Sequence, residues 1–452
     1  MSHIYSFHQL KEAILFNSHE VMPNDPEQID KEIETLVNAA NASGEQIRHY
    51  IGYEVSGLLH FANTTYQMMK VAKLQAAGVK CHIWLADYHT WINKKLDGKI
   101  STIRNVAKNY FAPIFKKTLE SCGGNAEELV ILYAKEEYFK FKGEDNLSFW
   151  DCELECESKI SLSRVLRSLS IAGKEAGQDI DYQVTRYPGM QAADVFWLQT
   201  HLVQAGLDQR KIYVSTRDIA LKIDPIYQLK IGGKSIKPIA MSASLLLGLD
   251  KPKETVIETK ELTIQEQQNL MYLQQEVAQS GTVNLDEIDQ TVARNTLELI
   301  TEHHAKTVEV NKMSKSKPDS CIFVHDSVEE IRRKLKKAYC PMPRPEEQTL
   351  AEIETEQLWN PMLDWSKKMI FPSGRNLVIE RKPEWGGDVT YNDYETLKDD
   401  YFTGKIHPMD LKTAVGNALI DWFEIIRDWG DENPEIIELV IPPPLKTSDN
   451  LT

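Results

Sequence analysis

The chain has 452 residues, which is too long for one typical domain and predicts two or three domains. Its hydrophobic fraction of 42% and charged fraction of 26% are ordinary for a globular protein and allow a large core without disulfide bonds. The formal net charge of −15 argues against a nucleic-acid partner held by overall charge, although it leaves room for a local basic face.

The cysteines are scattered along the chain and do not form a zinc motif. Only Cys152 and Cys156 are close together, and their spacing is not that of paired zinc ligands. We therefore expect reduced thiols, a cytoplasmic location and no tightly bound metal. The N-terminal stretch MSHIYSFHQLKEAILF has polar residues at its apolar positions, so we do not expect a signal peptide. The longest apolar stretch, near 239–249, is too short to cross a membrane.

The first part of the chain has the pattern of a βαβ unit. A polar, helical segment covers residues 1–48, and a short strand follows at 51–53. Residues 64–77 form an amphipathic helix that Gly78 ends, and the apolar run 81–86 is typical of a buried parallel strand. This order predicts a doubly wound α/β sheet, in which ligands bind at the carboxyl ends of the strands.

The middle of the chain alternates strands, helices and two less typical segments. Residues 130–133 are predicted to form a strand and 184–202 a helix. Residues 140–160 are charged and aromatic and have the character of an insertion. Residues 251–310 are acidic and polar with helical periodicity, and they contain no chemical motif.

The last part of the chain is predicted to be helical. After Val328 the residues Ile331, Leu335 and Ala338 share one face. The opposite face is predicted to be basic and exposed, and it carries Arg332, Arg333, Lys334, Lys336 and Lys337. This face supplies a local basic patch, although such charge runs are usually only solvated surface. The Pro-rich tail from Pro442 is expected to be disordered.

One loop carries alternating cations and hydroxyls. Its residues run from Asn311 to Pro318 and include Lys312-Met313-Ser314-Lys315-Ser316. The serines and the proline make it a poor helix, so it is predicted to be a loop that could wrap a polyphosphate and neutralise its charge. The alternative is a solvated lysine run.

A second motif runs from Tyr50 to Asn63 with the sequence YIGYEVSGLLHFAN. A strand leads into a glycine turn, and the first turn of the following helix is predicted to carry His60. Free backbone N–H groups at a helix N-terminus bind phosphate. The alternative is an ordinary structural turn between strand and helix.

A third motif places polar side chains on one helix face. Tyr187, Gln191 and Asp194 are spaced i, i+4 and i+7, so they either line a pocket for a small polar molecule or form plain surface. The sequence DQRKI follows at 208–212.

A fourth motif lies near the C-terminus, at 382–388 and 407–412. Trp385 offers a stacking face and Asp410 a carboxylate acceptor, which together suit a splayed single-stranded base. The alternative is a buried tryptophan with a helix N-cap.

Together, in this order, the four motifs resemble the class I aminoacyl-tRNA synthetases, and among them the tyrosyl-tRNA synthetases of archaea and eukaryotes. Residues 312–316 match the KMSKS consensus without a mismatch, and 50–63 are similar to the HIGH region. YPGMQAAD at 187–194 resembles the YPxMQxxD signature. The resemblance covers roughly 50–90, 185–215 and 310–415.

This resemblance implies a fold and an activity. The expected fold is an α/β catalytic domain with a Rossmann-like doubly wound parallel sheet, followed by an α-helical anticodon-binding domain. The expected domains are an N-terminal helical segment at 1–48, the catalytic domain at 49–330 with insertions near 140–160 and 251–310, the helical domain at 331–440 and a tail at 441–452. The expected reaction is the ATP-dependent ligation of L-tyrosine to tRNA(Tyr) through tyrosyl-adenylate, with Mg²⁺ accompanying ATP, in a homodimer that binds no membrane.

The resemblance also implies roles for single residues. Catalysis is expected of His60, Lys312 and Lys315. The tyrosine-binding residues are expected to be Tyr50, Gly52, Glu54, Tyr187, Gln191, Asp194 and Gln209, and the stretch from Trp84 to Ala86 a wall of their pocket. The ATP-binding residues are expected to be Ser56, Gly57, His60, Asn63, Met313, Ser314, Lys315 and Ser316. The tRNA-binding residues are expected to be Arg210, Lys211, Trp385 and Asp410.

The chain departs from the family pattern in three places. The HIGH element reads His60-Phe61-Ala62-Asn63, Val55 stands where proline is common, and 251–310 is long where archaeal relatives are short. Eukaryotic members also have alanine at the third HIGH position, and Asn63 retains hydrogen-bonding groups, so an active site is expected.

Two other functions stay open at this stage. Tryptophanyl-tRNA synthetases share the fold and both signature loops, and an inactive RNA-binding paralogue would explain the altered HIGH element. The pair of Tyr50 and Asp194 favours a phenolic substrate, and the intact loop at 312–316 favours an active enzyme.

Overall fold

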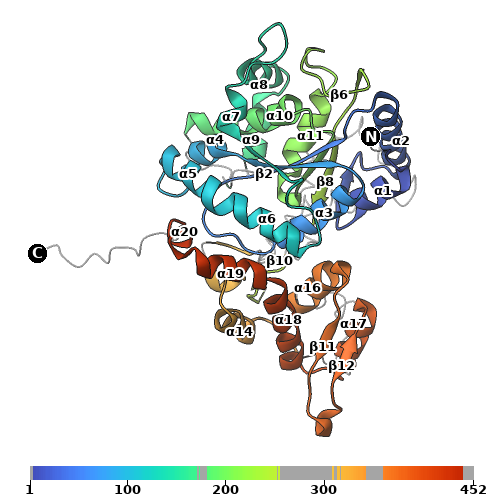
Figure 1. Cartoon of the computed structure of the whole chain (residues 1–452), viewed down its shortest axis with the longest axis vertical. Coiled ribbons are helices and arrows are strands. Elements are labelled where there is room, and N and C mark those ends of the chain that lie inside the picture. The colour runs from blue at the N-terminus through green and yellow to red at the C-terminus, as the bar shows by residue number, and fades with distance from the viewer. Residues whose placement is uncertain are drawn as a thin grey trace, which may run out of the picture. The chain divides into compact units, whose positions relative to one another are not determined.

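The computed structural model describes residues 4–169, 173, 181–251, 253–254, 308–309, 313–315, 317–342 and 360–440 (Figure 1). Contacts divide the chain into two units, one of residues 1–249 with 312–452 and one of residues 250–311. In the second unit, β9 (Lys253–Glu254) pairs antiparallel with β10 (Val308–Glu309). The rest of the helical pattern predicted for 251–310 and the tail from Pro442 lie outside the described residues.

A six-stranded sheet forms the centre of the first unit, with the order β1-β8-β5-β2-β3-β4. Its strands are β1 (Glu20–Met22), β2 (Arg48–Tyr53), β3 (Lys80–Leu85), β4 (Val130–Tyr133), β5 (Leu202–Gly206) and β8 (Ile239–Ala243). All neighbours are parallel except β1, which pairs antiparallel with β8 at the edge. The strand order reverses beside β2, which is where an open α/β sheet forms its ligand crevice. The predicted doubly wound sheet is confirmed.

Two hydrophobic clusters cover the two faces of this sheet. Side chains alternate along a strand, so Tyr50 and Trp84 belong to one cluster while Ile51 and Ile83 belong to the other. The strands are buried on both sides, which explains the near-continuous apolar run at 81–86.

Helices alternate with the strands in the first part of the chain. They are α1 (Phe7–Leu15), α2 (Pro26–Ser43), α3 (Thr65–Ala76), α4 (Asp87–Ile92), α5 (Ile100–Val106), the π-helix η1 (Ala107–Phe111), α6 (Ala112–Ser121), α7 (Ala134–Tyr138), α8 (Phe149–Glu157), α9 (Leu162–Ser168), the 3-10 helices η3 (Tyr182–Arg186) and η4 (Leu207–Gln209), α10 (Tyr187–Trp197) and α11 (Arg210–Ile219). The hairpin of β6 (Lys230–Ile231) and β7 (Lys234–Ser235) precedes β8.

Two predictions for this part need correction. The N-terminal segment is helical but also contains β1, whose three residues are too few for a periodic signal. The helix predicted at 184–202 ends at Trp197, and Gln199 has a positive φ of 52° before β5 begins at Leu202. Because both the helix end and the strand are buried and apolar, periodicity alone does not separate them.

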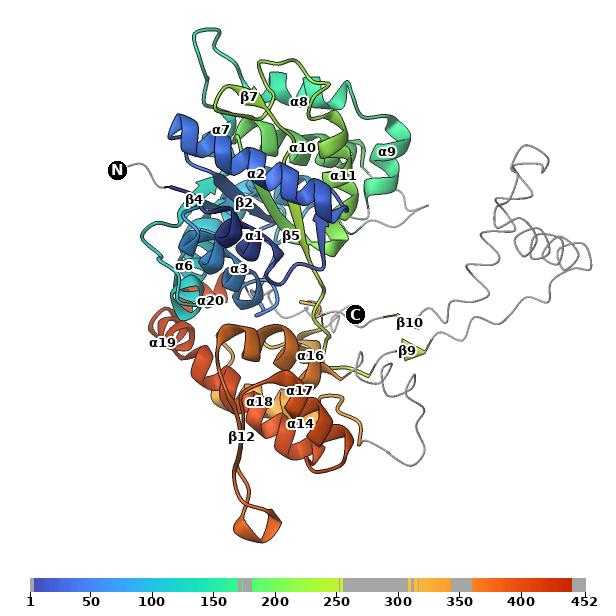
Figure 2. The same ribbon diagram turned by 90° about the vertical axis from the view of Figure 1, so that its right-hand side faces the viewer.

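The C-terminal part is mainly helical and contains a β-hairpin that the sequence pattern did not indicate. Its elements are η5 (Pro318–Ser320), α14 (Val328–Lys337), α16 (Pro361–Trp365), the π-helix η6 (Ser366–Ile370), η7 (Phe371–Ser373), β11 (Leu377–Ile379), η8 (Pro383–Trp385), β12 (Val389–Tyr391), α17 (Tyr394–Phe402), α18 (Pro408–Trp422), α19 (Glu424–Glu432) and α20 (Pro434–Glu438). Strands β11 and β12 pair antiparallel, and the loop between them projects away from the helices (Figure 2).

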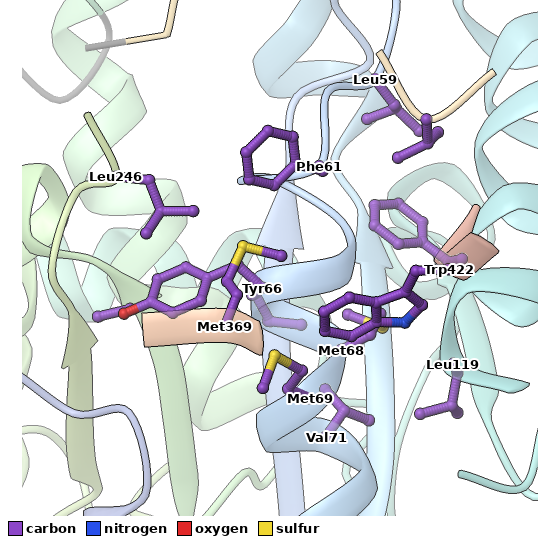
Figure 3. Close-up of a cluster of buried hydrophobic side chains, with 14 of the residues drawn as sticks. Leu59, Phe61, Tyr66, Met68, Met69, Val71, Leu119, Leu246, Met369 and Trp422 are labelled. Atoms are coloured by element: carbon purple, nitrogen blue, oxygen red, sulfur yellow. The ribbon is translucent and has the colours of Figure 1, made fainter. Parts of the chain in front are cut away.

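The C-terminal helices share a hydrophobic core with the sheet domain. Figure 3 shows Met68 and Met69 of α3 in one cluster with Met369 and Trp422. The indole nitrogen of Trp422 donates to the carbonyl of Ser121 at the end of α6, 3.1 Å away. The predicted boundary between 330 and 331 therefore separates two parts that bury apolar surface together, and the domain limits stay a prediction.

One residue of helix α14 is buried although the pattern of basic residues predicted that it is exposed. Lys334 was predicted to face solvent, but its side chain is buried and its ammonium nitrogen lies 2.6 Å from a carboxylate oxygen of Asp326. Asp326 lies one residue before Ser327, which caps the helix by accepting from the backbone of Glu330. Burial raises the pKa of Asp326, and the charge of Lys334 opposes that rise.

We expect Asp326→Asn to lower the free energy of unfolding by about 3–5 kcal/mol, because a buried ammonium group then loses its closest carboxylate and keeps the more exposed Glu330, 3.9 Å away. Urea unfolding followed by circular dichroism measures the change. The matched control is Asp319→Asn, which removes an exposed partner of Arg333 and should change stability little. If Asp326→Asn is as harmless as the control, the ion pair does not stabilise this helix.

Candidate active site

A cavity of about 350 Å³ opens at the carboxyl ends of the parallel strands. It is lined by side chains from β2, β3, α10 and α11 and from the two loops that resemble synthetase signatures. The predicted site residues that line it are Tyr50, Gly52, Glu54, Ser56, His60, Asn63, Tyr187, Gln191, Asp194, Gln209, Met313 and Lys315. Lys312 and Ser316 lie outside the described residues.

Asp194 and Tyr50 line the part of the cavity that we call its deep end, because both side chains are almost completely buried. The two carboxylate oxygens of Asp194 accept from different donors, Oδ2 from the indole nitrogen of Trp84 at 3.0 Å and Oδ1 from the hydroxyl of Tyr138 at 2.7 Å. Burial raises the pKa of Asp194, while these two hydrogen bonds oppose the rise. His89 is the nearest imidazole, with Nε2 3.8 Å from Oδ2, and burial lowers its pKa to about 3. The carboxyl therefore accepts from neutral donors, and the charge of Glu153 adds to the rise in its pKa.

Tyr50 lines the same end of the cavity and belongs to a chain of hydrogen bonds. Its hydroxyl lies 3.1 Å from that of Tyr213. The side-chain amide of Gln191 donates to the Tyr213 hydroxyl at 3.1 Å and to the side-chain oxygen of Gln209 at 3.2 Å. Burial raises the pKa of both tyrosines. Sequence reasoning did not select Tyr213, although its place one helical turn after Gln209 could have indicated it.

Glu54 and Tyr187 form the side of the cavity. The hydroxyl of Tyr187 and the amide of Asn93 donate to the Glu54 carboxylate, the latter at 2.8 Å. Burial raises the pKa of Glu54, and the nearby charge of Lys95 works against it. A side chain at Gly52 would lie 3.3 Å from the hydroxyl oxygen of Tyr50 and within van der Waals contact of the Trp84 ring, so glycine keeps the cavity open there.

His60 does not lie in a helix, contrary to the sequence prediction. Helix α3 begins only at Thr65, and His60 forms an antiparallel bridge with Phe323 instead. The flanking backbone pairs as well, with Phe61 N donating to Ile322 O and Val324 N donating to Leu59 O, each at 3.2 Å. This extended pairing competes with helix formation before residue 65. Burial lowers the pKa of the His60 imidazole to about 3, and its Nδ1 has no hydrogen-bond partner in the described structure.

Lys315 joins the loop of the KMSKS type to the glycine turn. Its ammonium nitrogen donates to the carbonyl of Ser56 at 2.8 Å, across 259 residues of sequence. Gly57 has a φ of 80°, and the Lys315 side chain runs close beside it. Desolvation lowers the pKa of Lys315 to about 8, while the charge of Glu54 opposes that change. Met313 is buried in the cavity wall, and the backbone nitrogen of Ser314 donates to the hydroxyl of Ser320 at 3.2 Å.

Helix α16 supports the cavity from the C-terminal part, which sequence reasoning did not anticipate. The ring of Trp365 packs edge-on against Phe61 with centroids 4.7 Å apart, and its indole nitrogen donates to Leu247 O at 2.9 Å. Asp364 accepts from Leu247 N at 3.0 Å. The segment that α16 holds directly follows Leu246, which lines the cavity.

The four residues predicted to bind tRNA lie outside the lining of this cavity. The guanidinium of Arg210 makes two hydrogen bonds to Glu20, at 2.6 and 2.8 Å, and the ammonium of Lys211 donates to Arg167 O at 3.2 Å. Trp385 is 65% exposed in the loop of the β11–β12 hairpin, so the alternative of a buried tryptophan is wrong.

Asp410 occupies the first turn of α18, and the N-cap of that helix is His407. The imidazole Nδ1 of His407 accepts from Met409 N at 3.1 Å. The motif at 407–412 therefore does contain a helix N-cap, as the alternative expected, and the capping residue is His407.

Within the part of the chain that the structure describes, no three His, Cys, Asp or Glu side chains are arranged to hold a metal ion. No helix of that part is long and apolar enough to cross a membrane.

The chain is similar to a family of known proteins. The family model described as tRNA synthetases class I (W and Y) matches residues 42–254 and 274–424. A tyrosine–tRNA ligase of Pyrococcus furiosus is 36% identical over 400 residues, which cover 88% of this chain and 90% of the relative. Tyrosine–tRNA ligase 1 of Pyrobaculum aerophilum is 36% identical over 385 residues, covering 85% and 86%.

Solved structures agree with these relatives. The tyrosyl-tRNA synthetase of Pyrococcus horikoshii, complexed with L-tyrosine, superposes with a TM-score of 0.74 at 32% identity and covers 96% of this chain and 99% of its own. The tyrosyl-tRNA synthetase of Aeropyrum pernix superposes with a TM-score of 0.65 at 27% identity, covering 96% and 98%. The chain therefore belongs to the class I tRNA synthetase family that comprises the tryptophanyl and tyrosyl enzymes.

Proposed function

We propose that this chain is a tyrosine–tRNA ligase, an ATP-dependent enzyme that forms tyrosyl-adenylate from L-tyrosine and then transfers the tyrosyl group to the 3′ end of tRNA(Tyr). The observation that carries the proposal is one continuous cavity with two different ends. Tyr50 and Asp194 interact with each other and offer hydroxyl-binding groups in one part of the lining, while His60 and Lys315 interact with each other in another part. The archaeal relatives are named for this reaction, and the Pyrococcus horikoshii structure is described as a complex with L-tyrosine.

The deep end suits the side chain of tyrosine. A phenolic hydroxyl between Tyr50 and Asp194 can accept from the first and donate to the second. Phenylalanine would leave these buried groups unpaired, which is costly, and tyrosyl-tRNA synthetases are themselves a known example of this kind of rejection. Gly52 leaves the room for the ring.

The α-ammonium group of tyrosine has acceptors in the same cavity. The side-chain oxygen of Gln191 is buried and lacks a hydrogen-bond partner in the described structure. An ammonium donor there would satisfy it, with the oxygens of Gln209 and Tyr187 beside it. We therefore assign Gln191, Gln209 and Tyr187 to this group.

The other end suits ATP. We assign Ser56, Gly57, His60 and Asn63 to the nucleotide, and Met313 to the adenine through its backbone. The unpartnered Nδ1 of His60 and the neutral state of its ring suit a hydrogen bond to phosphate or ribose.

The first step is an in-line displacement. The tyrosine carboxylate attacks the α-phosphate of ATP, the bond to the β-phosphate breaks, and pyrophosphate leaves. Lys315 stabilises the charge that develops on pyrophosphate, together with Lys312, Ser314 and Ser316. In the second step the terminal ribose hydroxyl of tRNA takes the tyrosyl group and AMP leaves. Because no bond to the protein forms, positioning supplies much of the rate.

Magnesium is proposed as the companion of ATP. Mg²⁺ commonly binds through substrate phosphates with few protein ligands, which fits the chemistry of this cavity, where carboxylates such as Glu54 and Asp194 are already hydrogen-bonded. When bound, it neutralises phosphate charge.

We propose that the protein is cytoplasmic and that it contacts tRNA through two regions. Arg210 and Lys211 would contact the acceptor end, and Arg210 must exchange Glu20 for a phosphate or base. Trp385 and Asp410 would contact the anticodon, with the exposed indole as a stacking platform.

We further propose a homodimer. Four apolar side chains around α8 and α9 are more than half exposed, namely Leu154, Leu162, Leu166 and Tyr182. Such clustered apolar surface is typical of protein interfaces.

The double variant Leu162→Asp with Leu166→Asp should elute from a size-exclusion column as a monomer, whereas the unchanged chain elutes as a dimer. A monomeric unchanged chain in light scattering would contradict the proposal.

The reaction itself is tested by ATP–pyrophosphate exchange with each of the twenty amino acids. We expect tyrosine alone to support exchange, because only a phenol pairs with both Tyr50 and Asp194. Exchange with tryptophan instead would identify a tryptophanyl enzyme. No exchange with any amino acid, from protein that still binds tRNA, would favour an inactive paralogue.

Lys315→Ala should slow adenylate formation by about 100- to 1,000-fold, as expected when one group that stabilises transition-state charge is removed. Lys317→Ala, an exposed lysine of the same loop, is the matched control and should be nearly unchanged. Single-turnover formation of tyrosyl-adenylate measures both. Similar rates for the two variants would remove Lys315 from the mechanism.

The same lysine predicts a dependence on pH. A lysine is charged below its pKa, so with a pKa of about 8 the unliganded enzyme loses the Lys315 charge as the pH rises above 8. We expect kcat/KM for ATP to fall roughly tenfold per pH unit above that point. The Lys315→Ala variant should lack this descending limb; a limb of equal steepness in the variant would assign it to another group.

A further inference from the structure

We propose that Trp84 and Tyr138 are positioning residues that set the selectivity of the pocket for an amino acid with a side-chain hydroxyl, because they hold the two oxygens of Asp194 by separate hydrogen bonds. The inference rests on the proposed function of the pocket and adds two residues to its recognition of tyrosine.

Neutral hydrogen-bond donors hold the carboxyl group of Asp194. The carboxyl is almost completely buried, at 1% exposure, and its neighbours within hydrogen-bonding distance are neutral donors. An indole N–H can only donate, so the bond from Trp84 fixes Asp194 as the acceptor. Tyr138 donates to the other oxygen. The two bonds hold the carboxyl at a fixed orientation.

Asp194 keeps acceptor positions that a ligand can use. A carboxylate has about four lone-pair positions, and the two donors use one on each oxygen. Trp84 lines the cavity beside Asp194, whereas Tyr138 is not among the lining residues. The remaining acceptor positions can therefore meet a hydroxyl that enters the cavity. A ligand without a donor at that place leaves a buried acceptor unpaired.

Tyr138 is itself held in place by an aromatic cluster. Its ring stacks on Phe149 of α8, with centroids 3.5 Å apart and an angle of 13° between planes. Trp84 lies on the same cluster, with its ring 5.6 Å from that of Tyr138. Helix α8 is in turn fixed by an ion pair between its buried Glu153 and Arg186, the residue directly before α10.

The segment predicted as an insertion at 140–160 thus contributes Phe149 and Glu153 to the support of the recognition residues. This support explains how Asp194 keeps its position although no cation pairs with it in the described structure. Without the two donors, the carboxyl would be free to rotate or to take up a proton and act as a donor, and it would then discriminate less between ligands.

Tyr138→Phe tests this idea because it removes one oxygen and keeps the stacked ring. We expect kcat/KM for tyrosine in pyrophosphate exchange to fall about 10- to 100-fold, in line with one hydrogen bond to a charged group. The value for phenylalanine should stay the same or rise, so that the tyrosine-to-phenylalanine ratio falls by at least tenfold. KM for ATP should not change.

The matched control is Tyr88→Phe. Tyr88 stacks on Tyr138 in the same aromatic cluster, with centroids 5.6 Å apart, but it makes no hydrogen bond to Asp194 in the described structure. Its selectivity ratio should equal that of the unchanged enzyme. If Tyr138→Phe does not fold, as judged by thermal unfolding, Trp84→Phe serves as the second variant with the same expected fall in the ratio.

The outcomes separate this proposal from the proposed function. An unchanged ratio in a folded Tyr138→Phe or Trp84→Phe enzyme that still activates tyrosine overturns the proposal alone. Equal losses for tyrosine, phenylalanine and ATP overturn it too, because they indicate a structural role only. If the unchanged enzyme does not activate tyrosine, the proposed function fails and the proposal fails with it.

Discussion

The backbone pairing of residues 59–61 with residues 322–324 is the constraint on which the site depends. It fixes the segment around His60 in an extended form beside Phe323, and the hydrogen bond from Lys315 to Ser56 extends the contact to the glycine turn. Two loops that are more than 250 residues apart in sequence thereby become one surface facing the cavity. The conformational entropy lost in closing so long a loop grows only slowly with loop length, and burial of the shared hydrophobic core offsets it.

That core also explains the position of the C-terminal helices. Trp365 contacts Phe61 on one side and the backbone of Leu247 on the other, so the same indole supports the histidine segment and the wall that contains Leu246. Trp422 closes the far end of the cluster against α6. The helical part is therefore a structural element of the end of the cavity that we propose binds ATP, as well as a proposed contact for tRNA.

The deep end of the cavity is organised by carboxylates that accept hydrogen bonds from uncharged donors. Asp194 is buried and has no closely paired cation in the described structure, which is unfavourable for a charged group unless donors surround it. Glu54 is half-buried, and the ammonium nitrogen of Lys95 lies 3.9 Å from its carboxylate. Here the donors are tyrosine, tryptophan and asparagine side chains. A pocket of neutral donors and acceptors distinguishes ligands by the groups they can pair, and this is the property that selection of a phenol requires.

The sequence predicted much of this site because its main signals are local. The βαβ pattern of residues 50–90 and the single polar face of Tyr187, Gln191 and Asp194 depend on neighbours in sequence, and the structure has both. Tyr138 and Trp365 were missed because their contacts are made across the fold, whereas Tyr213 was missed although Gln209, one helical turn before it, is a local signal. Lys334 and His60 were misplaced because a buried carboxylate and a distant strand segment decide their environment.

The central claim is that one cavity holds tyrosine at its deep end and ATP at the other. A crystal structure with a non-hydrolysable tyrosyl-adenylate analogue tests it most directly. The account predicts that the phenol oxygen lies within hydrogen-bonding distance of Tyr50 and Asp194, with the adenosine beside His60 and Met313. An analogue bound with its phenol away from Asp194, or bound outside this cavity, would contradict the account.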